Sequence, residues 1–89
     1  MNDEIKAGIF VDFNFGTAIS LLKSGSKVAR KGWNGKGMWL ELSQYGYNAM
    51  YKDRPLSPHI LMATAQNTYI PWLASQSDIL AEDWIKLNG

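Results

Sequence analysis

Apolar positions recur with two different periods along this chain of 89 residues. Between Asn14 and Gly25 they are spaced by three and four positions, which is the period of one helical face. The residues of this stripe are Phe15, Ala18, Ile19 and Leu22. Asn14 is a favoured residue at a helix N-cap, and Gly25 suits the position after a helix end. The pattern therefore predicts a helix over residues 15–24.

The other apolar runs are short and alternate with polar residues, as half-buried strands do. They predict strands over residues 27–31, 38–42, 59–64, 68–72 and 83–87. Within the second strand, alternation predicts that Trp39 and Glu41 share the face opposite Leu40. Gln66 and Asn67 are predicted to form a tight turn, since Asn tolerates a left-handed conformation.

Pro71 cannot donate a hydrogen bond to a sheet, so the strand that contains it is predicted to end there or to lie at an edge.

Residues 44–57 are rich in Tyr, Asn, Gly and Pro, and we expect a long loop. Residues 1–13 form an N-terminal extension, in which residues 9–11 are either a short strand or a tail. The chain is thus predicted to be a single α+β domain over residues 1–89. One main helix packs on a small, mostly antiparallel sheet, with a short helical turn over residues 75–80.

Composition narrows the functional classes. Hydrophobic residues make up 46% of the chain, with four Trp, four Tyr and three Phe, so it is too apolar to be disordered. These are many rings for one small domain, and we expect some of them at an interface, hence a homo-oligomer. Tyr45, Tyr47 and Tyr51 are candidates for a rim or a subunit contact, whereas Trp84 is predicted to lie in the core.

The absence of Cys excludes disulfides, thiolate catalysis and Cys-ligated metals. His59 is the single His and is interpreted as a hydrogen-bonded structural residue rather than a base. The sequence shows no catalytic signature, no metal-ligand spacing and no cofactor motif. No signal peptide or long apolar run is present, so we expect a soluble cytoplasmic protein without a membrane partner.

The segment Arg30–Met38 combines cations, an indole, an amide and three glycines. Glycine lets the backbone approach a ligand, Trp33 offers a flat face for stacking, and Arg30 and Lys36 offer charge to a phosphate or carboxylate. This mixture predicts half of a pocket for a small anionic molecule with an aromatic ring. The alternative is a basic hairpin loop in which Trp33 is buried.

Charge is unevenly distributed, although the net charge is only +1. Five of the nine cations fall within one short segment: Lys23, Lys27, Arg30, Lys31 and Lys36. Such a patch suits a compact anion such as a pyrophosphate, whereas the low net charge argues against a nucleic-acid polymer as partner. The alternative is a solvated face of an amphipathic element.

A second motif, Pro71–Asp78, adds an indole and hydrogen-bonding groups. Trp72 could supply another aromatic surface, Ser75 could hold phosphate, Gln76 could read an amide or a base edge, and Asp78 could accept hydrogen bonds from ribose hydroxyls. The structural alternative is a capping box, in which Ser75 is the N-cap and Asp78 the N3 residue of a short helix.

Four segments resemble a family of phage Thoeris anti-defence proteins, the second type, formerly known only as a domain of unknown function. These segments are Phe15–Ala18, Val28–Met38, Pro58–Ile60 and Pro71–Trp84. The chain departs from the family pattern at Thr17, where an acidic residue is common, and at Gln66-Asn67, where Asp-Gly is common. The N-terminal extension is less typical, and no role is carried over to it.

The resemblance implies a sponge that binds a cyclic ADP-ribose isomer, of the glycocyclic type, without cleaving it. It implies action in the host bacterial cytoplasm and a homotetramer with pockets between subunits. In such a pocket, adenine would stack on Trp33 or Trp72. The pyrophosphate would be bound by Arg30, Lys36 and helix N–H groups. The riboses would be bound by Asn34, Ser75, Gln76 and Asp78, and Met38 would line the pocket.

Two other functions remain open from the sequence. One is an enzyme, a phosphodiesterase or hydrolase of the same nucleotide, since two carboxylates far apart in sequence can share a cleft. The other is a small module that binds single-stranded nucleic acid through its Trp and Lys residues.

Overall fold

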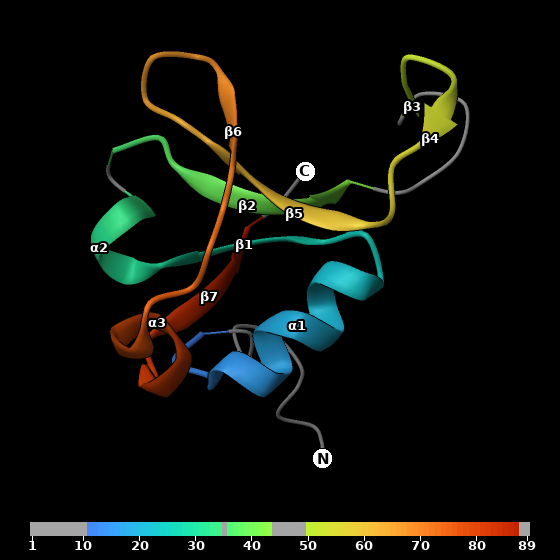
Figure 1. Ribbon diagram of the computed structural model, residues 1–89. Helices are drawn as coiled ribbons and strands as arrows, with labels where there is room; N and C mark the ends of the chain where they lie inside the picture. The colour runs from blue at the N-terminus through green and yellow to red at the C-terminus, as the bar shows by residue number, and fades with distance from the viewer. Residues whose placement is uncertain (1–10, 35, 44–49, 88–89) are drawn as a thin grey trace.

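The computed structural model describes residues 11–34, 36–43 and 50–87, and it has the predicted α+β fold (Figure 1). A five-stranded sheet has the strand order β6-β5-β2-β1-β7, and every neighbouring pair is antiparallel. Its strands are β1 (Lys27–Arg30), β2 (Trp39–Ser43), β5 (His59–Ala63), β6 (Tyr69–Pro71) and β7 (Trp84–Leu87). Each differs from its predicted range by one residue at one or both ends.

The main helix, α1 (Phe15–Lys23), packs against β1, β2 and β7. The side chain of Asn14 accepts a hydrogen bond from the backbone N–H of Thr17 at 2.9 Å, as an N-cap residue does. Beyond the helix end, Gly25 has φ 95°, a conformation that glycine adopts without strain. The predicted helix is confirmed, and it ends one residue earlier than expected.

The edge position and the turn conformation are also confirmed. β6, which contains Pro71, is the last strand on one side of the sheet. Asn67 has φ 67°, but the connection between β5 and β6 is longer than the predicted two residues. It is closed by Thr64 and Thr68, whose hydroxyl oxygens are 2.6 Å apart and whose backbone groups are hydrogen-bonded.

A one-turn helix, α2 (Lys31–Asn34), follows β1, where the sequence predicted a glycine-rich turn. Strand pairing stops at Lys31, whose backbone N–H donates to the carbonyl oxygen of Asp83 at 3.1 Å. The helical turn then directs Trp33 against the core. The prediction missed this element because Gly32, within it, favours a turn over a helix.

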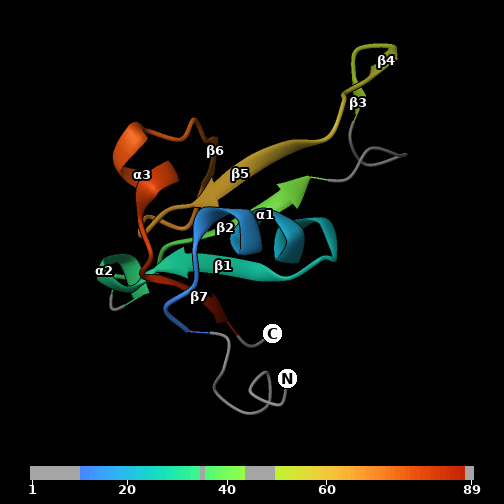
Figure 2. The same cartoon turned by 90° about the horizontal axis from the view of Figure 1, so that it is seen from below.

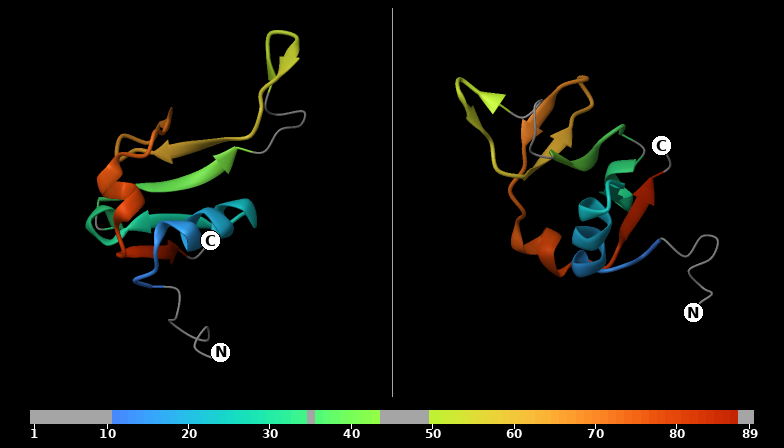
Figure 3. Two further views of the ribbon diagram at one scale, coloured as in Figure 1. Left: turned by 60° about the horizontal axis from the view of Figure 1, so that its bottom comes forward. Right: turned by 90° about the vertical axis from the view of Figure 1, so that its right-hand side faces the viewer.

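A small hairpin forms part of the segment that was predicted to be a loop. Its strands are β3 (Met50–Tyr51) and β4 (Arg54–Pro55), and Lys52 has φ 57° in the connection between them. The hairpin projects beyond the end of the five-stranded sheet (Figure 3). Residues 44–49 lie outside the described residues, as do Tyr45 and Tyr47 with their predicted roles. Tyr51 is exposed on β3.

The core lies between α1 and one face of the sheet. Its fully buried members are Ala18, Leu22, Val28, Leu40 and Trp84, each at most 1% exposed. Trp84 is thus in the core, as predicted. Figures 2 and 3 show α1 and the short helix α3 (Gln76–Leu80) on the same side of the sheet. None of the helices in the described ranges lies over the opposite face.

The end of the N-terminal extension joins the sheet beside β7. Phe13 and Trp84 exchange two backbone hydrogen bonds, of 3.1 and 3.2 Å. Residues 1–10, which include most of the predicted strand or tail, lie outside the described residues.

Candidate ligand-binding site

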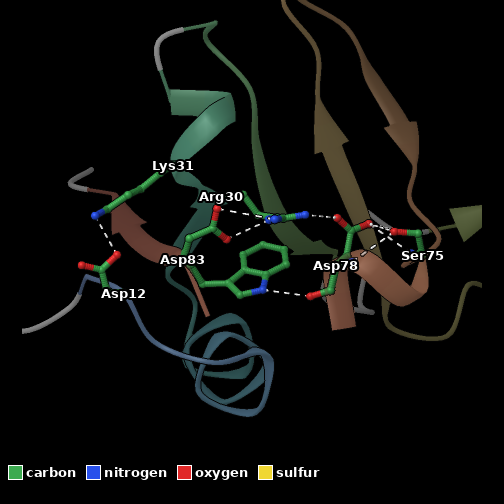
Figure 4. Close-up of polar contacts among 7 residues, drawn as sticks. Asp12, Arg30, Lys31, Ser75, Asp78 and Asp83 are labelled. Carbon is green, nitrogen blue, oxygen red and sulfur yellow. Dashed lines mark hydrogen bonds and ion pairs between the residues drawn. The ribbon is translucent and has the colours of Figure 1, made fainter. Parts of the chain in front are cut away.

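Arg30 lies at the end of β1 and joins two carboxylates from much later in the chain (Figure 4). Its Nε atom is 2.8 Å from Oδ1 of Asp83, and its Nη1 atom is 3.1 Å from Oδ1 of Asp78. The pairing of β1 with β7 sets Arg30 opposite Trp84 and so brings Asp83 close to it. The hydrogen bond to Asp83 is the main reason that the pKa of Arg30 is raised.

Asp78 and Ser75 form the capping box of α3 (Figure 4). The hydroxyl oxygen of Ser75 accepts from the backbone N–H of Asp78 at 3.1 Å, and Oδ2 of Asp78 accepts from the backbone N–H of Ser75 at 3.0 Å. Partial burial alone would raise the pKa of Asp78, but the hydrogen bonds from Ser75 and Arg30 lower it below 3.8. The capping prediction is confirmed, and this carboxylate is ionised at neutral pH.

Four aromatic rings meet beside this polar network. Trp33 on α2 and Trp72 after β6 both pack against Trp84, with ring centroids 5.5 and 6.2 Å away, and Phe15 contacts Trp84 from α1 at 5.6 Å. Edge-to-face pairs at such separations are favourable because ring edges are positive and ring faces negative. Two motifs that are far apart in sequence are therefore packed together through their indoles.

The angle between Trp33 and Trp72 limits how they can hold a ligand. Their centroids are 6.2 Å apart, and their planes are inclined by 75°. A planar ring needs two parallel surfaces to be held between them. Within one chain, a base can therefore stack on one of these two rings but cannot be sandwiched by both.

The remaining predicted site residues are more dispersed. Lys36 is exposed in the turn after α2, and Gln76 is exposed at the start of α3. Met38 is half-buried and lines a separate hollow of about 490 Å³ with Trp39 and Ile85. Asn34 ends α2, but its side chain lies outside the described part of the structure.

Another hollow, of about 460 Å³, lies between α1 and the neighbouring ends of β2 and β5. Its lining is mostly apolar and includes Leu22, Leu42 and Ile60. His59 is at its edge, and its Nδ1 atom is 2.7 Å from the carbonyl oxygen of Ser57, in agreement with a hydrogen-bonded structural role. The sequence did not predict this hollow, because it depends on how the helix sits on the sheet.

Comparison with known proteins assigns the family. The model of the Thoeris anti-defense 2-like domain matches residues 13–87. The chain belongs to the Thoeris anti-defense 2-like family. It is also similar to the protein named "Thoeris anti-defense 2" from Bacillus phage SP01, with 41% identity over 80 aligned residues that cover 80% of this chain and 90% of the relative. The family resemblance predicted from the sequence is confirmed.

The Thoeris anti-defense 2-like model begins to match at the residue that makes the first strand contact in the described part of the chain. Phe13, its first residue, is the one that bridges to Trp84. Both predicted motifs lie within this range, so the Arg30 network and the aromatic cluster are contained in the family domain.

Sequence reasoning missed two participants in the network. Asp83 is the nearest carboxylate to Arg30, and the indole N–H of Trp84 donates to the carbonyl oxygen of Asp78 at 3.1 Å. The register of β1 with β7 brings Asp83 to Arg30, and the short connection from α3 to β7 brings Trp84 to Asp78. A second ion pair links the N-terminal segment to α2, with Lys31 Nζ 2.7 Å from Oδ1 of Asp12 (Figure 4).

Neither a metal-ligand cluster nor a membrane-spanning helix is present in residues 11–34, 36–43 and 50–87. Within these ranges, no group of three or more His, Cys, Asp or Glu side chains could hold a metal ion. In the same part of the chain, no helix has the length and apolar character needed to cross a membrane.

Proposed function

We propose that this protein inhibits Thoeris defence by binding a cyclic ADP-ribose-type signal, a glycocyclic isomer, and holding it intact. The observation that carries the proposal is the meeting of the two predicted motifs within a chain of the Thoeris anti-defense 2-like family. Arg30 and Trp33 from the first motif contact Asp78 and Trp72 from the second. The name of the phage relative supports the defence system concerned.

The contacts suggest a division of roles at this site. Arg30 already holds two carboxylates, so its first role is to fix Asp78. A carboxylate has about four acceptor positions, and the hydrogen bonds from Arg30 and Ser75 leave room for a ribose hydroxyl. Lys36 is exposed in the turn after α2 and has no carboxylate partner in the described part of the chain, so it is the cation proposed for the pyrophosphate. Asn34, Gln76 and Met38 complete the proposed set.

Binding without cleavage agrees with the state of Asp78. A general acid or base works best when its pKa lies near the operating pH. The pKa of Asp78 is lowered from 3.8 instead, and both of its oxygens already accept hydrogen bonds. The proposal therefore uses Asp78 as a fixed hydrogen-bond acceptor for the signal, and we propose that the protein is not an enzyme.

The 75° angle between Trp33 and Trp72 also bears on assembly. The two indoles of one chain give a base only one stacking surface, and the proposal places a second surface on another subunit. We accordingly propose a homo-oligomer, a tetramer, with the signal bound between subunits. The host bacterial cytoplasm, where the signal is made, is the proposed place of action.

Titration calorimetry with cyclic ADP-ribose isomers tests the proposal. The wild-type chain is expected to bind one isomer with a Kd of nanomolar order, about −12 kcal/mol. Replacing Trp33 by Ala is expected to weaken binding by about 1–3 kcal/mol, the usual effect of losing one base–aromatic stack. Trp33→Phe, which keeps a ring, should retain most of the affinity.

A control separates stacking from folding. Leu56→Ala removes an exposed apolar side chain that follows β4 and has no role in the proposed site, so it should leave affinity unchanged. Circular dichroism shows whether Trp33→Ala remains folded at the temperature of the titration. Unchanged affinity in a folded Trp33→Ala variant would exclude the stacking role, and absence of binding to every isomer by the wild-type chain would exclude the function.

A further inference from the structure

The apolar hollow beside α1 lies away from the proposed signal site and is here called the α1 hollow. Its lining consists of Ile19, Leu22 and Lys23 from α1, Leu42 from β2, and residues 58–60. The pairing of Val28 with Leu40 sets Leu42 beyond the start of β1, whereas Arg30 is the last residue of that strand. The two sites therefore lie at opposite ends of β1. Figure 1 shows α2 and α3 at one of these ends of the sheet and the β3–β4 hairpin at the other.

The α1 hollow has the size and the lining of a small-molecule site. Its volume of about 460 Å³ falls within the range of about 300–1,000 Å³ in which such ligands are bound. Leu22 is only 1% exposed, whereas Ile19, Leu42 and Ile60 are half-buried and still partly in contact with water. An apolar ring bound here would remove this remaining surface from water, which is favourable.

Lys23 supplies a charge at the edge of the α1 hollow. It is exposed in the last turn of α1, and in the described part of the chain it forms no ion pair. By contrast, Lys27, Arg30 and Lys31 each have a carboxylate oxygen within 3.5 Å. None of the described lining residues is acidic. The ammonium group of Lys23 is therefore available to an anion.

His59 adds an uncharged hydrogen-bonding group to the lining. Its Nδ1 atom lies 2.7 Å from the carbonyl oxygen of Ser57, which can only accept, so Nδ1 carries a proton. In the neutral ring, Nε2 is then an acceptor. The described lining thus offers one cation and one imidazole, and its other side chains are apolar.

We propose that the α1 hollow is a second binding site, for a small organic anion whose body is an apolar ring system. The ring packs against Ile19, Leu42 and Ile60, and a carboxylate attached to it pairs with Lys23. A nucleotide does not suit this hollow, because its phosphates and riboses need more polar partners than the described lining offers. A polypeptide segment does not suit it either, since its backbone groups would be buried against apolar side chains.

Three probe compounds test the ligand class with the full chain. 2-Naphthoate has both the ring body and the charge, 2-naphthamide has the ring without the charge, and acetate has the charge without the ring. We expect 2-naphthoate to bind with a Kd of about 1 mM or lower, as is usual for a ligand of this size. 2-Naphthamide should bind about three- to fivefold more weakly, which is the effect of losing one exposed ion pair. Acetate should not bind measurably.

Binding is followed in ¹H–¹⁵N NMR spectra, which also locate the site. The amide signals of residues that line the α1 hollow, such as Leu42 and Ile60, should shift on addition of 2-naphthoate. The signals of Trp33 and Asp78 in the proposed signal site should not.

Replacing Lys23 separates the contribution of its charge from a change in the fold. K23Q should weaken the binding of 2-naphthoate about three- to fivefold and leave that of 2-naphthamide unchanged, because only the acid uses the ammonium group. K31Q makes the same charge change beyond the other end of β1 and should affect neither compound.

A larger side chain tests the position of the ring. I19W fills the hollow from α1 and should abolish the shifts caused by both aromatic compounds. I70W puts the same ring on β6, at a residue that does not line the hollow, and should preserve them.

The proposal is overturned if 2-naphthoate does not bind, if its shifts map to other residues, or if K23Q weakens the acid and the amide equally or not at all. Because Lys23 is exposed, this comparison decides even if I19W fails to fold. Unchanged binding in a folded I19W variant would also contradict the proposal. Cyclic ADP-ribose should not displace 2-naphthoate, and displacement would contradict a separate site. Signal binding is measured by calorimetry, so its failure would leave the α1 hollow unaffected.

Discussion

The two faces of the five-stranded sheet differ in how deeply their large side chains are buried. On the face covered by α1, Leu22, Val28, Leu40 and Trp84 are almost completely buried, and the Arg30 network closes one end of the core. On the opposite face, Ala29, Ala63 and Ile85 are buried, but the larger side chain of Trp39 is only half-buried. The comparison indicates that stability of the free chain and the proposed signal site both depend on the covered face.

The largest expected effect compares two Trp residues on these faces. Trp84→Ala removes a side chain with 0% exposure that contacts Phe15, Trp33 and Trp72, and it should lower the free energy of unfolding by about 3–5 kcal/mol. Trp39→Ala should cost only about 1 kcal/mol in the free chain, mostly through the lost contact with Lys27. Urea denaturation at low protein concentration measures both, and equal losses would contradict the contrast between the faces.

A smaller effect compares two ion pairs that neighbour each other in sequence. Arg30→Gln leaves Asp78 and Asp83 without their charged donor and should cost about 2 kcal/mol. Lys31→Gln breaks a pair with Asp12 in which both side chains are 55% exposed, and it should cost about 0.5 kcal/mol or less. The same denaturation experiment applies. A loss at Lys31 as large as at Arg30 would show that the network adds nothing beyond surface pairing.

The smallest expected effect is a change in how the melting temperature depends on pH. The pKa of Asp78 is lower in the folded chain than its ordinary value of 3.8, so the unfolded chain binds a proton more readily at this residue. Its contribution to stability is therefore complete well above pH 3.8 and is lost as the pH falls through the folded pKa. Melting temperatures between pH 2.5 and 6 should fall less steeply with acid in Asp78→Asn than in the wild-type chain.

Parallel melting curves for the two chains would instead mean that other carboxylates carry the acid sensitivity. Asp83→Asn is the matched control, because Asp83 also pairs with Arg30 but lies outside the capping box.

Local patterns of the sequence predicted most of the fold. The stripe that includes Ala18 and Leu22, the N-cap Asn14 and the Ser75–Asp78 capping box all depend on residues within one or two helical turns of each other, and all are confirmed. By contrast, α2 was missed because the packing of Trp33 against the core outweighs the low helix propensity of Gly32. The β3–β4 hairpin was missed because its strands have only two residues each.

The candidate site was predictable in composition but not in geometry. Arg30, Trp33, Trp72 and Asp78 stand out in the sequence by residue type, and the structure brings them together. Their partner Asp83, 53 positions from Arg30 in the chain, becomes visible only through the pairing of β1 with β7. The angle between the two indoles likewise depends on how Trp84 packs between α1 and the sheet.

Release of bound signal tests the central proposal most directly. The purified protein is incubated with a cyclic ADP-ribose isomer, freed of unbound ligand by filtration and heat-denatured, and the released nucleotide is identified by mass spectrometry. We expect the intact cyclic signal in the protein fraction. A linear or hydrolysed product would mean that the protein is an enzyme, and the absence of retained nucleotide would contradict sequestration.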